Sequence, residues 1–192
     1  LSFKQNPESL KRGEELLKVA KNLTPNNERE KDYIDAVSIY FKDWRTLDTQ
    51  SRKLNYENKM EELYEKYPDD VETAVFYSLA VLASAELNDK TYSKQKKSGK
   101  ILEKLFKKYP NHPGIAHYII HNYDSPELAH MALNTARKYA VIAPASAHAQ
   151  RDARQGRRRG GARARRAGVR GEGAGARARG GGARGARKGG EG

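Results

Sequence analysis

The chain has 192 residues and a formal net charge of +13 at pH 7, which is spread very unevenly along the sequence. Residues 1–150 contain 23 basic and 21 acidic residues, whereas residues 151–192 contain 14 basic and 3 acidic residues. The absence of cysteine excludes disulfides, zinc–thiolate sites and thiol nucleophiles. No apolar run approaches the roughly 18 residues that a membrane-spanning helix needs, so we expect no membrane partner.

The first three expected helices are marked by capping residues and prolines. Asn6 and Pro7 suit the N-cap and the first position of a helix. Pro25 ends that helix, because the residue before a proline avoids the helical conformation. Asn27, followed by a glutamate three residues later, predicts the start of a second helix. A third helix is expected from about residue 49 to residue 67, where apolar side chains recur every three or four residues.

The fourth expected helix, residues 71–85, is apolar on most of its sides. Such a helix must be covered by more than one neighbour, so we expect it to be central. Asp69 is expected to cap its N-terminus. Trp44, in the link before the third helix, is expected to fill a gap between helix pairs.

A fifth helix is expected to end at Tyr109, and it carries lysines at positions 94, 96, 97 and 100. These lysines could form a basic patch or a solvated helix face. Because no aromatic residue interleaves the run for base stacking, we interpret it as a solvated face.

Two segments of the chain repeat visibly. EELYEKYPDD at 61–70 and EKLFKKYPNH at 103–112 are offset by 42 residues, and each ends a helix with Tyr-Pro. A later interval, from Pro110 to Pro144, spans 34 residues. Such self-similarity indicates stacked helix pairs, in which each pair buries its apolar face only against its neighbours.

The stretch from His112 to Pro144 resembles a tetratricopeptide repeat. With Pro113 as the first position, the usual packing positions fall on Ala116, Ile119, Ile120, Tyr123 and Ala132, and the closing proline falls on Pro144. The segments DWRTLD, YPDDVETAVFYSLAVLASA and NHPGIAHYIIHNYDSPELA are also similar to a group of uncharacterised bacterial tetratricopeptide-repeat proteins, over about residues 1–150. The resemblance implies an all-α solenoid of antiparallel helix pairs with about seven helices, shortened at both ends.

Residues 151–192 are expected to form a disordered basic tail. Of these 42 residues, 36 are Arg, Gly or Ala, so they cannot bury enough apolar surface to offset chain entropy. Basic usage changes from 18 Lys and 5 Arg in residues 1–150 to 1 Lys and 13 Arg in the tail. Arg, Gly and Ala all have GC-rich codons, so we interpret the tail as out-of-frame translation or an assembly error. The alternative is a genuine tail that grips phosphates nonspecifically.

One face of the expected helix after His112 carries the candidate functional residues. His117, His121 and Asp124 lie at i, i+4 and i+7, which a helix places on one side. The resemblance implies that these positions, with Ser125, line a concave groove. We interpret the four residues as a polar groove wall that contacts a bound peptide.

Metal binding is the alternative for the same face. Imidazoles at this spacing can bind zinc, and Asp124 with His130 or His148 could complete the ligand set. The segment lacks the glutamate of the H-E-x-x-H metalloprotease motif, so that reaction would have no general base.

We therefore expect a noncatalytic scaffold that holds a peptide or protein segment in its concave groove, as repeat arrays do. The alternatives are a metal-dependent enzyme with an incomplete His/Asp site, and nonspecific nucleic-acid binding by a genuine tail. No catalytic residue, metal or cofactor is predicted, because the sequence contains no nucleophile–base pair or phosphate-binding loop.

Overall fold

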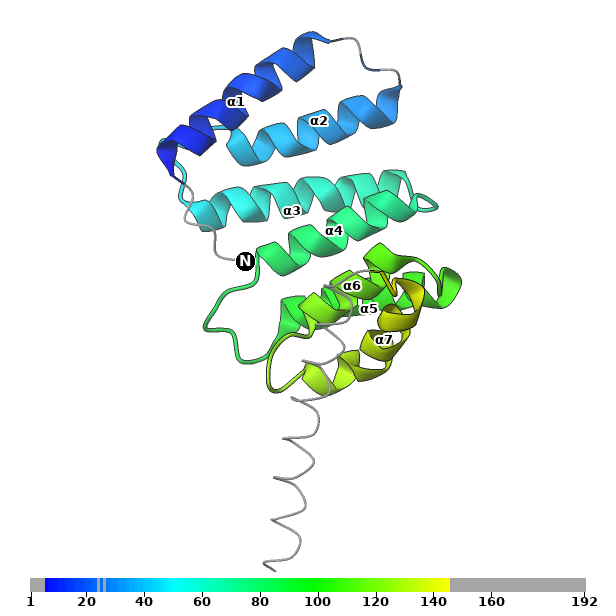
Figure 1. The fold of residues 1–192 in the computed structure, drawn as a ribbon. Helices are drawn as coiled ribbons and strands as arrows, with labels where there is room; N and C mark the ends of the chain where they lie inside the picture. Colours follow the sequence, from blue (N-terminus) through cyan, green and yellow to red (C-terminus); the bar gives the residue numbers. More distant parts are fainter. Residues whose placement is uncertain (1–5, 24, 26, 146–192) are drawn as a thin grey trace, which may run out of the picture.

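The computed structural model describes residues 6–23, 25 and 27–145, which form seven α-helices and no strand (Figure 1). The helices are α1 (Pro7–Asn22), α2 (Glu28–Phe41), α3 (Thr49–Lys66), α4 (Val71–Ala83), α5 (Ser93–Lys108), α6 (Pro113–Asn122) and α7 (Ala129–Ile142). The all-α prediction is confirmed for this part of the chain. None of these helices is long and apolar enough to cross a membrane. The predicted tail and His148 lie outside the described residues.

Most of the helices begin at a side chain that satisfies a free backbone N–H group. The Asn6 side chain accepts a hydrogen bond from the Ser9 amide (2.7 Å), and Asn27 accepts one from Glu30 (2.9 Å), as predicted. The cap of α4 is Asp70, whose carboxylate accepts from Glu72 (3.0 Å) and Thr73 (3.3 Å). The prediction of Asp69 as this cap was therefore wrong by one residue, because Asp69 lies inside the turn that follows Pro68.

Three helices end in the same way, each at a residue that precedes a proline. The C-cap residues Tyr67, Tyr109 and Ala143 have φ between −122° and −127° and ψ between 63° and 67°. Each donates its backbone N–H to the carbonyl four residues earlier, at 2.8, 2.8 and 3.0 Å. The following proline disfavours the helical conformation at the residue before it. These three helix ends, which we call Xaa-Pro stops, therefore share the same local backbone geometry.

The helices pack in chain order. Each helix contacts the next one in the sequence, and α4 also contacts α6. Figure 1 shows the resulting stack, with α1 and α2 at one end and α7 at the other. Because α4 touches α3, α5 and α6, the prediction that it is central is confirmed.

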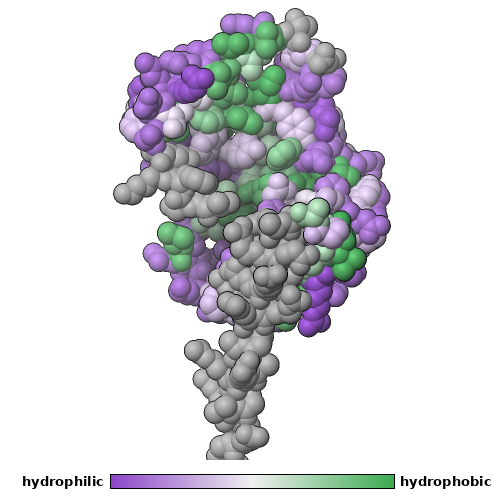
Figure 2. Space-filling model, viewed as in Figure 1, coloured by the Kyte–Doolittle hydropathy of each residue, from purple (hydrophilic) through white to green (hydrophobic). Residues whose placement is uncertain are grey.

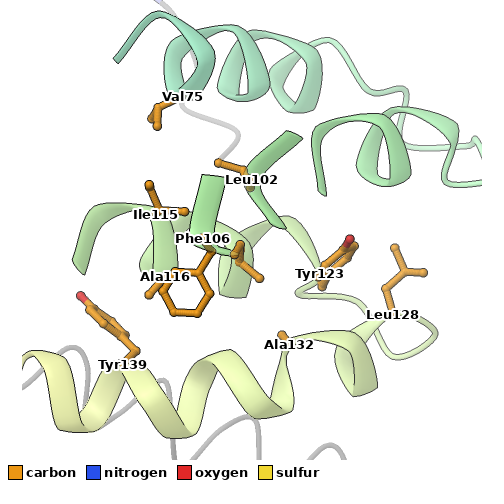
Figure 3. Close-up of a cluster of buried hydrophobic side chains, with 10 residues drawn as sticks. Val75, Leu102, Phe106, Ile115, Ala116, Tyr123, Leu128, Ala132 and Tyr139 are labelled. Carbon is orange, nitrogen blue, oxygen red and sulfur yellow. The ribbon is translucent and has the colours of Figure 1, made fainter. Parts of the chain in front are cut away.

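Two clusters of buried side chains hold the stack together. The first lies among α4, α5, α6 and α7, and Figure 3 shows its side chains pointing toward one another. It consists of Val75, Leu102, Phe106, Ile115, Ala116, Ile119, Tyr123, Leu128, Ala132 and Tyr139. The second lies among α2, α3 and α4, and it consists of Ala36, Met60, Leu63, Tyr77, Ala80 and Val81. Each helix from α2 to α7 therefore contributes apolar side chains to at least one of the two clusters.

Helices α5 and α6 approach each other closely at Gly99. A Cβ atom at this position would lie 2.0 Å from the Tyr123 hydroxyl oxygen. Tyr123 is buried and donates its hydroxyl proton to Glu103 (2.8 Å). Gly99 is therefore needed for packing, because it leaves room for the Tyr123 side chain.

Trp44 lies in the turn between α2 and α3, where it is half-buried. Its indole N–H donates to the Glu14 carboxylate of α1 (2.9 Å), and the Arg45 guanidinium lies 4.2 Å from the centre of its ring. The bond from Trp44, with further hydrogen bonds from Lys18 and Arg45, holds the pKa of Glu14 below its usual value. Trp44 thus attaches the turn to α1 through a polar bond, and its filling of a gap between helix pairs stays a prediction.

Candidate functional site

The predicted histidine face lies on a side of α6 different from the one that carries its buried apolar residues. The buried residues of α6 include Ile115, Ala116 and Ile119, which face the first cluster. His117 is half-buried and His121 is exposed, and their ring centroids are 4.5 Å apart in an edge-to-face arrangement. The structure therefore brings the two imidazoles together, as the spacing of four residues predicts.

His117 is also held by aromatic neighbours. Its ring centroid lies 5.4 Å from that of Tyr118 and 5.8 Å from that of Tyr139 on α7. Edge-to-face contacts at these distances are favourable for aromatic rings. His117 is thus positioned at the seam between α6 and α7, whereas His121 reaches farther into solvent.

Asp124 and Ser125 lie in the turn between α6 and α7. Asp124 is exposed and Ser125 is half-buried. The Ser125 hydroxyl oxygen accepts from the Leu128 amide (3.3 Å), and its carbonyl oxygen accepts from Leu128 (3.2 Å) and Ala129 (2.8 Å). Ser125 therefore shapes the start of α7, a structural role that helical spacing did not reveal.

The described residues contain no group of three or more His, Asp or Glu side chains that could hold a metal ion. His117, His121 and Asp124 accordingly do not form a three-ligand set. His130 is exposed on α7, and His148 lies outside the described residues.

An apolar surface on α1, α2 and α4 was not predicted from the sequence. Figure 2 shows hydrophobic side chains gathered over α1 and α2 and continuing toward α4. The large apolar side chains exposed on these helices are Leu16, Val19 and Leu23 of α1, Val37 of α2 and Phe76 of α4. We call these five residues the apolar face.

The contacts of Phe76 join α2 to α4. Its ring packs edge-to-face on Tyr33 of α2, with ring centroids 5.8 Å apart. The Tyr33 and Thr73 hydroxyls share a hydrogen bond of 2.6 Å, and Arg29 forms an ion pair with Asp70. These bonds fix the position of Tyr33, and 41% of Phe76 remains exposed.

A hollow of about 500 Å³ lies between α3 and α5. Its lining residues are Glu61, Tyr64, Glu65, Tyr77, Ser93, Lys96, Lys97, Lys100 and Ile101. Tyr64 stacks on Tyr77, with ring centroids 5.2 Å apart. Burial and the hydrogen bond to Glu61 raise the pKa of Tyr77 to about 12, so its hydroxyl stays protonated as a donor.

The lysines of α5 are not a wholly solvated face, and that interpretation was wrong for Lys94, whose side chain is 29% exposed. The Lys94 ammonium lies 2.6 Å from both carboxylate oxygens of Glu57, whose side chain is only 4% exposed. Lys97 lies 3.0 Å from Glu61. Aromatic residues also border the run, because α3 and α4 bring Tyr64 and Tyr77 beside it.

Comparisons of the chain with family models, curated proteins and solved structures give no match.

Proposed function

We propose that this chain is a noncatalytic helical-repeat scaffold whose groove binds a peptide or protein segment. In this proposal the fold is an α-solenoid of tetratricopeptide-like pairs, α2 with α3, α4 with α5 and α6 with α7. The first helices of successive pairs, α2, α4 and α6, line the groove, and α1 borders it beside α2. The exposed apolar face carries the proposal, because large apolar side chains clustered at a surface are typical of interaction sites.

Contacts between corresponding helices support the solenoid. Tyr33 and Thr73, which join α2 to α4, are 40 residues apart in the sequence. On the other side of the stack, Lys94 and Glu57 join α5 to α3 at a separation of 37 residues. The helix ends that precede a proline, at residues 67, 109 and 143, recur at intervals of 42 and 34 residues. Bonds at nearly constant separation are expected when equivalent helices stack on one another.

The apolar face and the histidine face have complementary roles in this proposal. Phe76 and Val37 receive apolar side chains of the bound segment, which gives most of the binding free energy. The exposed His121 contacts its backbone, which gives orientation, and His117, whose Nδ1 atom is buried, supports the His121 ring. Asp124 flanks them just after the end of α6, whereas Ser125 stabilises the turn between α6 and α7 through its hydrogen bonds to Leu128 and Ala129.

Selection of random peptides against the full chain tests the proposal. Selected peptides should share apolar residues at a regular spacing, and Phe76→Glu should weaken their binding at least about tenfold, because a charge would be buried at the centre of the interface. Leu87→Glu is the matched control, since Leu87 is 93% exposed in the turn between α4 and α5. Equal loss of binding in both variants, or selected peptides without a shared pattern, would refute the proposal.

A further inference from the structure

The charged residues of helix α5 are almost all positive. It has seven lysines and a single acidic residue, Glu103. Outside α5, residues 1–150 contain 16 basic and 20 acidic residues, so the basic excess of the described region is concentrated on this helix. Its exposed lysines are Lys96, Lys97, Lys100, Lys104, Lys107 and Lys108, which we call the lysine face.

Much of this charge is not neutralised. Lys97 is paired with Glu61, and the Lys96 ammonium donates to the Thr91 carbonyl (2.8 Å). Lys100, Lys104 and Lys107 form no ion pair with any residue that the structure describes. They follow each other by four and three residues, so they lie along one side of the helix at intervals of about 5–6 Å. Such a row of cations can follow a chain of phosphate groups.

The neighbouring helix α7 does not compensate this charge. It contains no acidic residue, and it contributes Arg137 and Lys138. The Lys138 ammonium lies 5.7 Å from the centre of the Phe106 ring, which belongs to the buried side of α5. Helix α7 therefore adds two cations and no acidic residue to this end of the stack.

The hollow between α3 and α5 opens beside the first half of the lysine face. Lys96, Lys97 and Lys100 belong to its lining, together with the half-buried ring of Tyr64 and the side chain of Ile101. An aromatic ring next to cations can stack on an unpaired base whose phosphates the cations bind. The carboxylate of Glu65 also lines the hollow, and it can accept a hydrogen bond from a base amino group.

We propose that the lysine face and this hollow bind single-stranded nucleic acid. The phosphates lie along Lys100, Lys104 and Lys107, and one unpaired base enters the hollow against Tyr64. This site is separate from the apolar face and does not depend on the proposed peptide function. It also uses none of the arginines in residues 151–192.

Other polyanions fit the surface less well. An acidic peptide would bring its carboxylates next to Glu65, where like charges repel. An anionic membrane is bound most firmly where exposed apolar side chains can enter the lipid. Among the residues that the structure describes, the exposed large hydrophobic side chains lie on elements other than α5.

The test uses the full chain and a single-stranded oligodeoxycytidine, because the cytosine amino group can donate a hydrogen bond to the Glu65 carboxylate. Lysine acylation, followed by mass spectrometry with and without the oligonucleotide, reports each lysine separately. Protection of Lys100, Lys104 and Lys107, with no protection of Lys31 on α2, is the expected result. This readout separates binding on α5 from any binding by the arginine-rich tail.

Charge reversal provides the second measurement. Two lost phosphate contacts lower the affinity for a single strand about 25-fold at about 0.1 M salt, and they reduce the slope of log K against log salt by about 1.4. We expect at least this loss for Lys100→Glu with Lys104→Glu. The matched control is Lys31→Glu with Lys42→Glu, two exposed lysines of the α2 region with the same change in charge. Circular dichroism verifies that both double variants remain folded.

Three results would overturn the proposal. The first is equal protection of Lys31 and Lys104 by the oligonucleotide. The second is an equal loss of affinity in the two double variants. The third is protection of the same three lysines by polyglutamate at least as strong as by the oligonucleotide, which would assign the surface to acidic peptides.

Discussion

The ion pair between Glu57 and Lys94 allows a sharp test of the packing between α3 and α5. Two variants, Lys94→Met and Glu57→Gln, remove the same ion pair, but they leave different partners behind. The Glu57 side chain is 4% exposed, whereas the Lys94 side chain is 29% exposed. After Lys94→Met the carboxylate stays buried, while after Glu57→Gln the ammonium can turn toward water. We therefore expect Lys94→Met to be the more destabilising change.

The magnitudes follow from the contacts that remain. Breaking a buried ion pair from one side costs about 3–5 kcal/mol, and we expect about 2–3 kcal/mol for Lys94→Met, since Lys94 is partly exposed and Lys97 remains nearby. Lys97 lies 3.9 Å from Glu57. Glu57 also accepts a hydrogen bond from the Ser84 hydroxyl. Glu57→Gln keeps an acceptor for Lys94 and a group that can bond to Ser84, so about 1 kcal/mol is expected. In the double variant Glu57→Met with Lys94→Met no charge stays buried, and a cost within about 1 kcal/mol is expected.

Urea unfolding followed by circular dichroism measures these differences, provided that the slope of the unfolding free energy against urea is unchanged. Lys11→Met is the control, because Lys11 pairs with Glu15 at 3.9 Å and both side chains are more than half exposed. Such a pair contributes at most about 0.5 kcal/mol. If Glu57→Gln were as costly as Lys94→Met, or the double variant cost as much as the two single changes together, the desolvation argument would be wrong.

Two further predictions concern packing and pH. Gly99→Ala should lower the free energy of unfolding by about 1–3 kcal/mol, because the buried Tyr123 side chain cannot move away from the added methyl group. The control is Gly114→Ala, which should be neutral or stabilising, since a Cβ atom there would lie 3.2 Å from its nearest contact, the His112 ring. Equal losses of stability in urea unfolding of the two variants would contradict this prediction. Hydrogen bonds from Thr91 and Ser93 hold the pKa of Asp89 at about 2, below its ordinary value of 3.8. The stabilisation by Asp89 is therefore complete above about pH 4 and is lost as the pH falls through 2. Asp89→Asn should accordingly lower the melting temperature at about pH 6 but not at about pH 2, and a difference that persists at low pH would exclude this origin.

Most helix ends could be predicted because their signals are local. Asn6 and Asn27 bond to an amide three residues away, and each Xaa-Pro stop is complete within one helical turn. The position of the α4 cap depends on how the turn after Pro68 bends the chain. That bend places Asp70, and not Asp69, at the first free amides, and two adjacent aspartates give the sequence no means of choosing between them.

The candidate site was predictable only where a single helix determines it. Helical spacing is sufficient to bring His117 next to His121, because both belong to α6. Phe76 could not be identified in the same way, since α4 is apolar on most sides and its periodicity does not show which side is exposed. Its exposure depends on where α2 and α6 lie, and that arrangement depends on residues about 40 positions away.

The surroundings of the lysine face were even harder to predict from the sequence, because they also depend on how the helices stack. Along the sequence the run contains no aromatic residue, which argues against nucleic-acid binding. In the stack, α3 lies beside α5, so Tyr64 borders lysines that follow it by more than 30 residues. Acidic residues of α3 meet the first turns of α5, where Glu57 and Glu61 bind Lys94 and Lys97. Neither α6 nor α7 contains an acidic residue, so these two helices bring no equivalent negative charge to the second half of α5. The stacking of helices therefore neutralises one end of the lysine run and leaves the other end positive, so the charge available to a partner follows from the helix neighbours and not from the run itself.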